Sequence, residues 1–163
     1  MPARRSRKVP PKSRPGTRLA LELQVVARGI AVPAPARFRL WARTALKKHA
    51  EITVRVVGAA EARRLNRSYR RRDYATDVLA FPYPAPRGTI RGDIVLCAPV
   101  LVREARARGR TQMAHFAHLT VHALLHLQGS DHGRPREAGR MEAEEKRLLG
   151  KLGYPDPYAD IEG

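Results

Sequence analysis

Histidine is the residue type whose placement in this chain first indicates chemistry. Four of the six histidines fall between residues 115 and 126, and a fifth, His132, follows shortly after. Within the stretch HALLHLQGSDH, His122 and His126 are four residues apart, so on a helix their rings share one face about one turn apart. Gly129 tolerates backbone angles that other residues avoid, and a turn there can bring His132 back toward the same point.

Three neutral imidazoles that converge in this way form a ligand set typical of zinc. They leave the fourth position of a tetrahedral Zn²⁺ open for water, which is the arrangement of catalytic rather than structural sites. The metal lowers the pKa of that water to roughly 7, giving hydroxide-like reactivity at neutral pH. We therefore predict one Zn²⁺ ion per chain, held by His122, His126 and His132.

Other interpretations of the same stretch are possible. A single buried histidine is more often a core residue with a backbone partner, but three of them with a turn residue at workable spacing favour a metal site. His118 is a rival ligand one turn before His122, and because three histidines in a row drift around a helix axis we predict that His118 supports the ligands or the core. Asp131 is predicted to orient a ligand histidine, with a turn-forming role as the alternative.

The spacing of the three histidines is also that of the metzincin peptidases, H-E-x-x-H-x-x-G-x-x-H. In this chain Ala123 stands where those enzymes have glutamate. Peptide hydrolysis by that route needs the carboxylate to take a proton from the zinc-bound water. A peptidase is therefore the weaker hypothesis, and it requires an acid supplied from another part of the chain.

A run of arginines precedes the third predicted strand, with Tyr69 and Tyr74 interleaved. Its six members lie within ten residues: Arg63, Arg64, Arg67, Arg70, Arg71 and Arg72. Guanidinium groups contact phosphates and aromatic rings stack on bases, so the run is a candidate wall of an RNA channel. Such runs are commonly just solvated surface, but the overall charge and the nearby metal site favour binding.

The composition supports a nucleic-acid partner and one packed domain. Lys and Arg total 32 against 15 acidic residues, giving a formal charge of +17 and a pI near 11.3. Such a surface attracts polyanions by releasing their counterions. With 163 residues and 43% hydrophobic content the chain can build a single core. Its apolar stretches are too short to span a membrane, and the lone Cys97 suits the reducing cytoplasm.

Residues 1–18 differ from the rest of the chain. They carry seven basic residues, four prolines and no acid, and they show no apolar periodicity. We predict a disordered basic tail over 1–18 that adds nonspecific RNA affinity, with an organellar targeting leader as the alternative. A single domain is predicted over residues 19–163.

Hydrophobic periodicity predicts an α+β domain, because strands fill the first two thirds and helices gather at the end. The helix over 111–127 has apolar residues around much of its circumference and should lie buried at the centre. In the first helix, Leu40, Trp41 and Leu46 are expected to face the core. The predicted strands are 19–27, 51–57, 76–83 and 89–97, and the predicted helices are 33–50, 59–70, 98–109, 111–127 and 136–153.

Together these motifs resemble the YbeY-type endoribonucleases, also called rRNA maturation factors. The family signature is H-G-x-L-H-L-x-G-[YH]-D-H, and this chain has HALLHLQGSDH. LNRSYR…TDVLAFP is similar to the family's L-N-x-x-Y-R…T-D-V-L-S-F-P, and GDI and the ending MEAEEKRLLGKLGYPDPY also match. The likeness covers about residues 20–158. Ala80, Ala123 and Ser130 depart from the family pattern, and none of them is a proposed ligand.

The resemblance implies a single zincin-like α+β domain, with a mixed sheet of about four strands packed on a central histidine-bearing helix. It implies cleavage of single-stranded RNA in rRNA maturation, notably at the 3′ end of 16S rRNA, and a part in ribosome quality control. By the same resemblance His122, His126 and His132 are the zinc ligands and Arg70 is an active-site residue. A guanidinium there can grip a phosphate and stabilise charge that develops in the transition state.

The partners expected on this basis are pre-rRNA and the small ribosomal subunit. A ribosomal protein or a GTPase assembly factor is a further expected partner, and no membrane is involved. A noncatalytic ribosome-assembly factor, binding RNA and using zinc only for structure, is the alternative from another class. A metallopeptidase is the third and weakest hypothesis.

Overall fold

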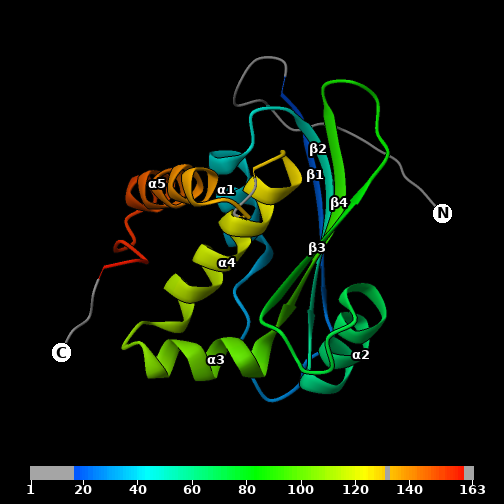
Figure 1. Ribbon diagram of the computed structural model, residues 1–163, viewed down its shortest axis with the longest axis vertical. Coiled ribbons are helices and arrows are strands. Elements are labelled where there is room, and N and C mark those ends of the chain that lie inside the picture. The colour runs from blue at the N-terminus through cyan, green and yellow to red at the C-terminus, as the bar shows by residue number, and fades with distance from the viewer. Residues whose placement is uncertain (1–16, 131–132, 160–163) are drawn as a thin grey trace.

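The computed structural model describes residues 17–130 and 133–159 (Figure 1). Within them four strands and five helices follow the order that the hydrophobic pattern predicts. They are β1 (Leu19–Val25), α1 (Pro35–Ala45), β2 (His49–Val57), α2 (Ala59–Arg70), β3 (Val78–Tyr83), β4 (Thr89–Cys97), α3 (Ala98–Ala107), α4 (Gln112–Leu127) and α5 (Pro135–Lys151). The predicted α+β class is confirmed.

The four strands form one mixed sheet in the order β1-β2-β4-β3. Strands β1, β2 and β4 run parallel to one another, with Leu21 of β1 opposite Ile52 of β2 and Ile52 opposite Gly92 of β4. The edge strand β3 runs antiparallel to β4, with Ala80 opposite Ile94. The predicted mixed sheet of about four strands is therefore confirmed, and α4 packs against its antiparallel edge strand β3 and against β4.

Helices cover the two faces of this sheet unequally. In Figure 1, α1, α4 and α5 lie on one side of the sheet and α2 lies on the other. The larger core, between the sheet and α1, α4 and α5, contains Trp41, Ile94 and Leu124 among many others. The smaller core, under α2, contains Leu79 and Cys97. The site described below forms on the α4 side of β3.

The central helix α4 is the most buried helix in the described part of the chain, as its apolar circumference predicts. Thr111 caps its first turn by accepting a hydrogen bond from the Ala114 N–H at 3.0 Å. At the other end Gly129 takes a left-handed backbone angle, φ +104°, and the Ser130 N–H bonds the Leu125 carbonyl at 3.0 Å. This left-handed glycine ends the helix where the sequence places its stop.

The first helix is shorter than predicted, and one of its expected core residues is wrong. It ends at Ala45, and residues 49–50 belong to β2 instead. Leu40 is 49% exposed, whereas Trp41 is fully buried. The buried face runs through Phe38, Trp41 and Ala45, at the three- and four-residue spacing of one helical face, and Leu40 falls outside it. Leu46, just beyond the helix, is buried as expected.

Of the predicted tail over 1–18, residues 1–16 lie outside the described residues. Arg18 extends the strand pairing beyond β1, because its carbonyl accepts the Ala50 N–H at 2.9 Å and its N–H bonds His49 Nδ1 at 3.0 Å. No helix in residues 17–130 and 133–159 is both long enough and apolar enough to cross a membrane.

Gly92 gives a direct test of the packing between α4 and the sheet. A Cβ at Gly92 would lie 2.9 Å from the Phe81 carbonyl oxygen and 2.9 Å from Leu127 Cδ2. Because a backbone atom cannot move aside cheaply, Gly92→Ala should lower the free energy of unfolding by about 1–3 kcal/mol, measured by urea titration.

Gly139→Ala is the matched control for that substitution. Gly139 is an exposed residue of α5 with no heavy atom within 4 Å of its ideal Cβ. Alanine there should raise the free energy of unfolding by about 0.5–1 kcal/mol through helix propensity. If both variants shifted stability in the same direction, the close approach at Gly92 would not be the cause.

Candidate active site

A pocket of about 330 Å³ lies where α4 faces β3 and the end of α2. Its lining includes His122 and His126 from α4 and Arg70 from α2. Tyr69 of α2 and Ala80 of β3 also line it. Residues that are more than fifty positions apart in the sequence thus line one cavity, and they include three of the predicted site residues.

The two described histidines of the predicted zinc set lie on one face of α4. His126 follows His122 by one turn, and both line the pocket. The side chain of His122 is 27% exposed, and His126 is exposed. The third predicted ligand, His132, and the predicted supporting residue Asp131 lie outside the described residues.

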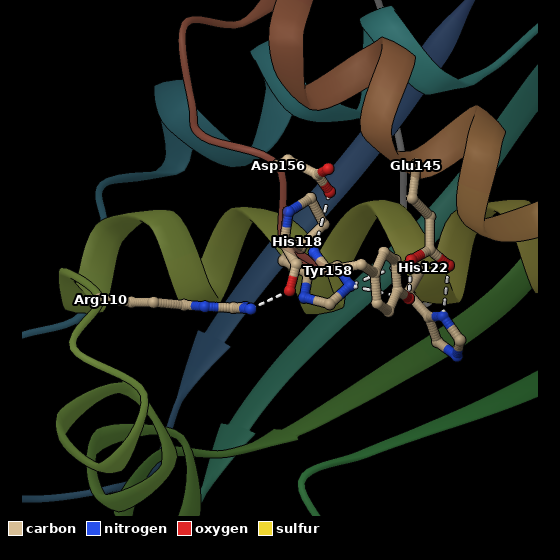
Figure 2. Close-up of polar contacts among 7 residues, drawn as sticks. Arg110, His118, His122, Glu145, Asp156 and Tyr158 are labelled. Atoms are coloured by element: carbon tan, nitrogen blue, oxygen red, sulfur yellow. Dashed lines mark hydrogen bonds and ion pairs between the residues drawn. The ribbon is translucent and has the colours of Figure 1, made fainter. Parts of the chain in front are cut away.

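Glu145 of α5 contacts the Nδ1 side of the His122 ring. Its carboxylate is fully buried, and Oε2 lies 2.6 Å from His122 Nδ1. Its Oε1 lies 3.0 Å from His118 Nε2 and also accepts a hydrogen bond from the Tyr158 hydroxyl. Figure 2 shows the three side chains around this one carboxylate.

The charge state of Glu145 determines which group donates and which accepts in each of these hydrogen bonds. Burial alone would raise its pKa, but the hydrogen bonds from His118, His122 and Tyr158 outweigh burial and lower the pKa to about 2. Glu145 is therefore a carboxylate that can only accept, and His122 must donate through Nδ1. The lone pair of that ring then lies on Nε2, which is the state that a metal ligand requires.

His118 lies behind the predicted ligands rather than among the pocket's lining residues. It is 5% exposed, and its ring meets those of His122 and Tyr158 edge to face, with centroids 6.4 and 5.3 Å apart. Its link to the pocket runs through Glu145. This placement agrees with a supporting role, which stays a prediction.

Sequence reasoning missed Glu145 and Tyr158. Glu145 carries a signal that could have revealed it, because the buried face of α5 runs through Met141, Glu145, Leu148 and Leu149. An acidic residue in the middle of an apolar stripe needs a buried partner. The partners lie on another helix, so no local pattern names them. Tyr158 follows α5 in a loop and has no comparable signal.

Arg70 is the last residue of α2, and the helix ends directly after it. Arg71 takes a left-handed backbone angle, φ 59°, and its N–H bonds the Arg67 carbonyl at 3.0 Å. Asn66 then fixes the loop that follows, because its side-chain amide donates to the Tyr74 carbonyl at 3.0 Å. This turn leaves Arg70 exposed at the rim of the pocket.

The other arginines of the run divide into two groups. Arg63 makes a bidentate ion pair with Asp73, at 2.7 and 3.0 Å, and Arg67 approaches the same carboxylate at 3.5 Å. The hydrogen bond from Arg63 lowers the pKa of Asp73. These pairs are exposed and hold the loop after α2 against that helix. Arg64, Arg71 and Arg72 are exposed.

An aromatic pair includes Tyr69, which lines the pocket next to Arg70. The Tyr69 ring lies on Phe81, with centroids 4.3 Å apart and planes tilted by 55°. Tyr69 is 52% exposed, so much of its ring remains accessible to solvent. An exposed aromatic ring next to a guanidinium is suited to a nucleobase and its phosphate.

The two proposed ligands within the described residues, His122 and His126, fit a zinc site. Among residues 17–130 and 133–159 no group of three histidine, cysteine or acidic side chains is placed to hold a metal ion. Two of the predicted ligands, His122 and His126, are in place, and Glu145 fixes the ligand-competent tautomer of His122. A carboxylate behind a ligand histidine is the usual arrangement in zinc sites.

The geometry weakens the peptidase hypothesis. The carboxylate that contacts His122 does so at Nδ1, on the side of the ring away from Nε2, and it is fully buried. Ala123, at the position of the peptidase glutamate, is also buried. Glu145 therefore supports a histidine and is not positioned as a general base beside a metal ligand.

Comparison with known proteins agrees with the resemblance seen in the motifs. Residues 36–153 match the family model described as Endoribonuclease YbeY. A protein of that name from Aromatoleum aromaticum is 57% identical over 127 residues, 78% of this chain and 82% of the relative. Another from Methylibium petroleiphilum is 50% identical over 147 residues, 90% of this chain and 97% of the relative. The chain belongs to the Endoribonuclease YbeY family.

A solved structure supports the fold of this YbeY family member. The solution structure of TM1509 from Thermotoga maritima matches it with a TM-score of 0.50 and 19% identity, over 86% of this chain and 99% of TM1509. At this identity the likeness concerns the fold alone. The family match includes Arg70, His122, His126 and Glu145, whereas Tyr158 lies beyond its last residue.

His115, one helical turn before His118, gives a pH test of this buried region. Its Nε2 lies 2.8 Å from Glu104 Oε1, yet burial, followed by the neighbouring His118 ring and the nearby charges of Arg110 and Arg108, lowers its pKa from 6.5 to about 4. The unfolded chain therefore binds a proton at a higher pH than the folded chain does. Stability should fall as the pH drops from about 6.5 to about 4, by up to about 3 kcal/mol.

His115→Gln should reduce this acid-induced loss. Urea unfolding of both proteins at several pH values in that window measures the slope of stability against pH. The parent should lose more stability than the variant across the window. Equal slopes would show that His115 does not carry the proton uptake.

Proposed function

We propose that this chain is a zinc-dependent endoribonuclease that cleaves single-stranded RNA during rRNA maturation, with the 3′ end of 16S rRNA as its place of action and a part in ribosome quality control. Membership of the Endoribonuclease YbeY family gives the reaction class. The observation that carries the assignment of the site is the pocket that Arg70 shares with His122 and His126.

The proposed zinc ligands are His122, His126 and His132. When bound, zinc supplies a Lewis acid for a phosphate oxygen and lowers the pKa of a water molecule. Glu145 accepts the hydrogen bond that His122 donates through Nδ1–H, which makes Nε2 the proposed ligand atom. The burial of that carboxylate excludes water from the side of the ring opposite the substrate.

Arg70 is the proposed catalytic residue. Its guanidinium lies at the rim of the pocket and can bind two oxygens of one phosphate, which orients the scissile bond toward the histidines. Negative charge grows on the phosphoryl oxygens in the transition state, and a fixed cation stabilises that state more than the ground state. Arginine keeps its charge at every physiological pH.

The surroundings of the pocket support a single-stranded substrate. The accessible Tyr69 ring can stack on a base only if that base is unpaired. Arg64, Arg71 and Arg72 are exposed beyond it and are proposed to contact phosphates, with Arg63 and Arg67 contributing charge beside Asp73. The formal charge of +17 favours any polyanion, so the aromatic ring carries the preference for single strands.

The proposed setting is the cytoplasm, with pre-rRNA and the small ribosomal subunit as partners. A ribosomal protein or a GTPase assembly factor would deliver or position the enzyme there. Residues 19–163 are proposed as the catalytic domain. The basic tail over 1–18 is proposed to increase affinity for RNA through its seven cations.

Arg70→Ala should reduce cleavage of a single-stranded RNA about 10²- to 10³-fold while the fold and the zinc content stay unchanged. The measurements are single-turnover cleavage, zinc analysis and circular dichroism on protein purified in high salt. Arg39→Ala is the matched control, since Arg39 is an exposed arginine of α1 that does not line the pocket.

Three outcomes of that experiment are informative. Loss of cleavage in Arg70→Ala alone supports catalysis at this pocket. Equal cleavage by parent and Arg70→Ala would remove Arg70 from the mechanism or reveal a contaminating nuclease. A parent that binds zinc and RNA but cuts nothing would favour the noncatalytic assembly factor.

Glu145→Gln should weaken zinc binding about 10- to 100-fold, because the amide cannot accept all three hydrogen bonds that the carboxylate accepts. Competition with a chromogenic chelator measures the affinity. Glu142→Gln makes the same chemical change at an exposed position of the same helix and should leave zinc affinity unchanged. An unaltered affinity in Glu145→Gln, with the fold intact, would mean that His122 is not a ligand.

A further inference from the structure

A second pocket lies on the other side of His118 from Glu145 and His122. Its volume is about 610 Å³, and it forms between the α3–α4 connection, α4 and the loop after α5. It shares no lining residue with the pocket that contains Arg70. Figure 2 shows His118 between the Glu145 carboxylate and the side chain of Arg110, which also lines this second pocket.

His118 presents an unsatisfied polar atom in this region. Its Nε2 is used by Glu145 and Tyr158, and within the described residues its Nδ1 has no hydrogen-bond partner although the residue is only 5% exposed. Nε2 faces the Glu145 carboxylate and the Tyr158 hydroxyl, so Nδ1 is the ring atom left for a ligand, and it accepts a hydrogen bond when the ring proton is on Nε2. A buried acceptor without a partner costs free energy, so the site favours a ligand that brings an N–H or O–H donor.

Two cations line the same pocket. Arg110 donates one hydrogen bond to the Pro157 carbonyl and has further N–H groups for a ligand. Burial, and then the charge of Arg108, lowers the pKa of Arg110, which means that its charge lacks sufficient compensation. Asp156 also lines the pocket, but its carboxylate accepts the Tyr158 N–H at 2.9 Å and faces Lys146 Nζ at 3.6 Å. The pocket therefore favours an anionic group.

The remaining walls are largely apolar. Leu149 of α5 and the chain from Tyr154 to Pro157 form them. Behind the pocket the Tyr154 ring meets the buried Trp41 ring edge to face, with centroids 6.3 Å apart. Such walls suit the faces of a planar ring system, and the volume lies within the range of small-molecule sites.

We propose that this pocket binds a nucleoside monophosphate or a similar anion built on a planar heterocycle. The phosphate pairs with Arg108 and Arg110, an exocyclic amine N–H of the base donates to His118 Nδ1, and the ring lies against Leu149 and Tyr154. This site goes beyond the proposed nuclease function, because it uses none of the residues of the Arg70 pocket. A ligand held there contacts the same His118 that hydrogen-bonds Glu145, so occupancy is linked to the support of His122.

The test is the binding of AMP, measured by calorimetry and by the fluorescence of Trp41, the single tryptophan of the chain. Physiological salt suppresses nonspecific attraction to so basic a protein. The parent should bind AMP, whereas adenosine and inorganic phosphate, which each lack one part of the recognised group, should bind about tenfold or more weakly. Absence of binding at millimolar AMP would overturn the proposal.

Three variants locate the bound AMP. Arg108→Gln leaves the Arg110–Pro157 contact in place and should weaken AMP about tenfold, and Arg108→Gln/Arg110→Gln should abolish binding. Arg106 lies in the last turn of α3 and does not line the pocket. Arg106→Gln makes the same charge change, and this variant should bind AMP normally. Circular dichroism checks that each variant is folded.

Arg70→Ala separates this proposal from the proposed function. AMP bound in the second pocket should be unaffected by Arg70→Ala, even if that substitution abolishes RNA cleavage. If Arg70→Ala removed AMP binding while the Arg108→Gln/Arg110→Gln protein retained it, AMP would occupy the nuclease pocket and the second site would be refuted. A protein that does not cleave RNA but binds AMP through Arg108 would refute only the nuclease.

Discussion

One buried carboxylate organises the candidate active site. Glu145 lies in a place where burial alone would favour its protonated form, and it remains ionised because two imidazoles and a phenol donate to it. The cost of burying the charge is offset only when all three donors are in position. The orientation of His122 therefore depends on α4, α5 and the loop after α5 together, rather than on the histidine-bearing helix alone.

The fold supplies the rigidity that this arrangement needs. α4 packs between α1, α3 and α5 and against β3 and β4, so nearly every face of the helix is in contact with another element. Close packing of this kind leaves a side chain few alternative rotamers. The end of α4, where His126 lies, lines the same pocket as the end of α2, and α2 ends in a left-handed turn at Arg71, directly after Arg70. Buried residues thus fix His122 while Arg70 remains accessible to solvent.

The sequence predicts the local features of this protein well and the distant ones poorly. The four-residue spacing of His122 and His126, the glycine stop of α4 and the alternation of the strands all follow from local geometry, and the structure agrees with them. Leu40 was expected in the core, but helical spacing from Trp41 places it on the exposed side. Glu145 is 23 residues from His122, and only the packing of α5 on α4 brings them together. The pairing of Arg63 with Asp73 likewise depends on the loop after α2.

Tyr158 has a consequence for the order in which this site matures during synthesis. Its hydroxyl completes the set of donors to Glu145, yet it lies 36 residues after His122. A ribosome releases the chain from its N-terminus onward, so the sheet and α4 can pack before that tyrosine has emerged. Until then the carboxylate lacks one of its proton donors. His122 should therefore reach its final orientation as one of the last events of folding, after the scaffold around it has formed.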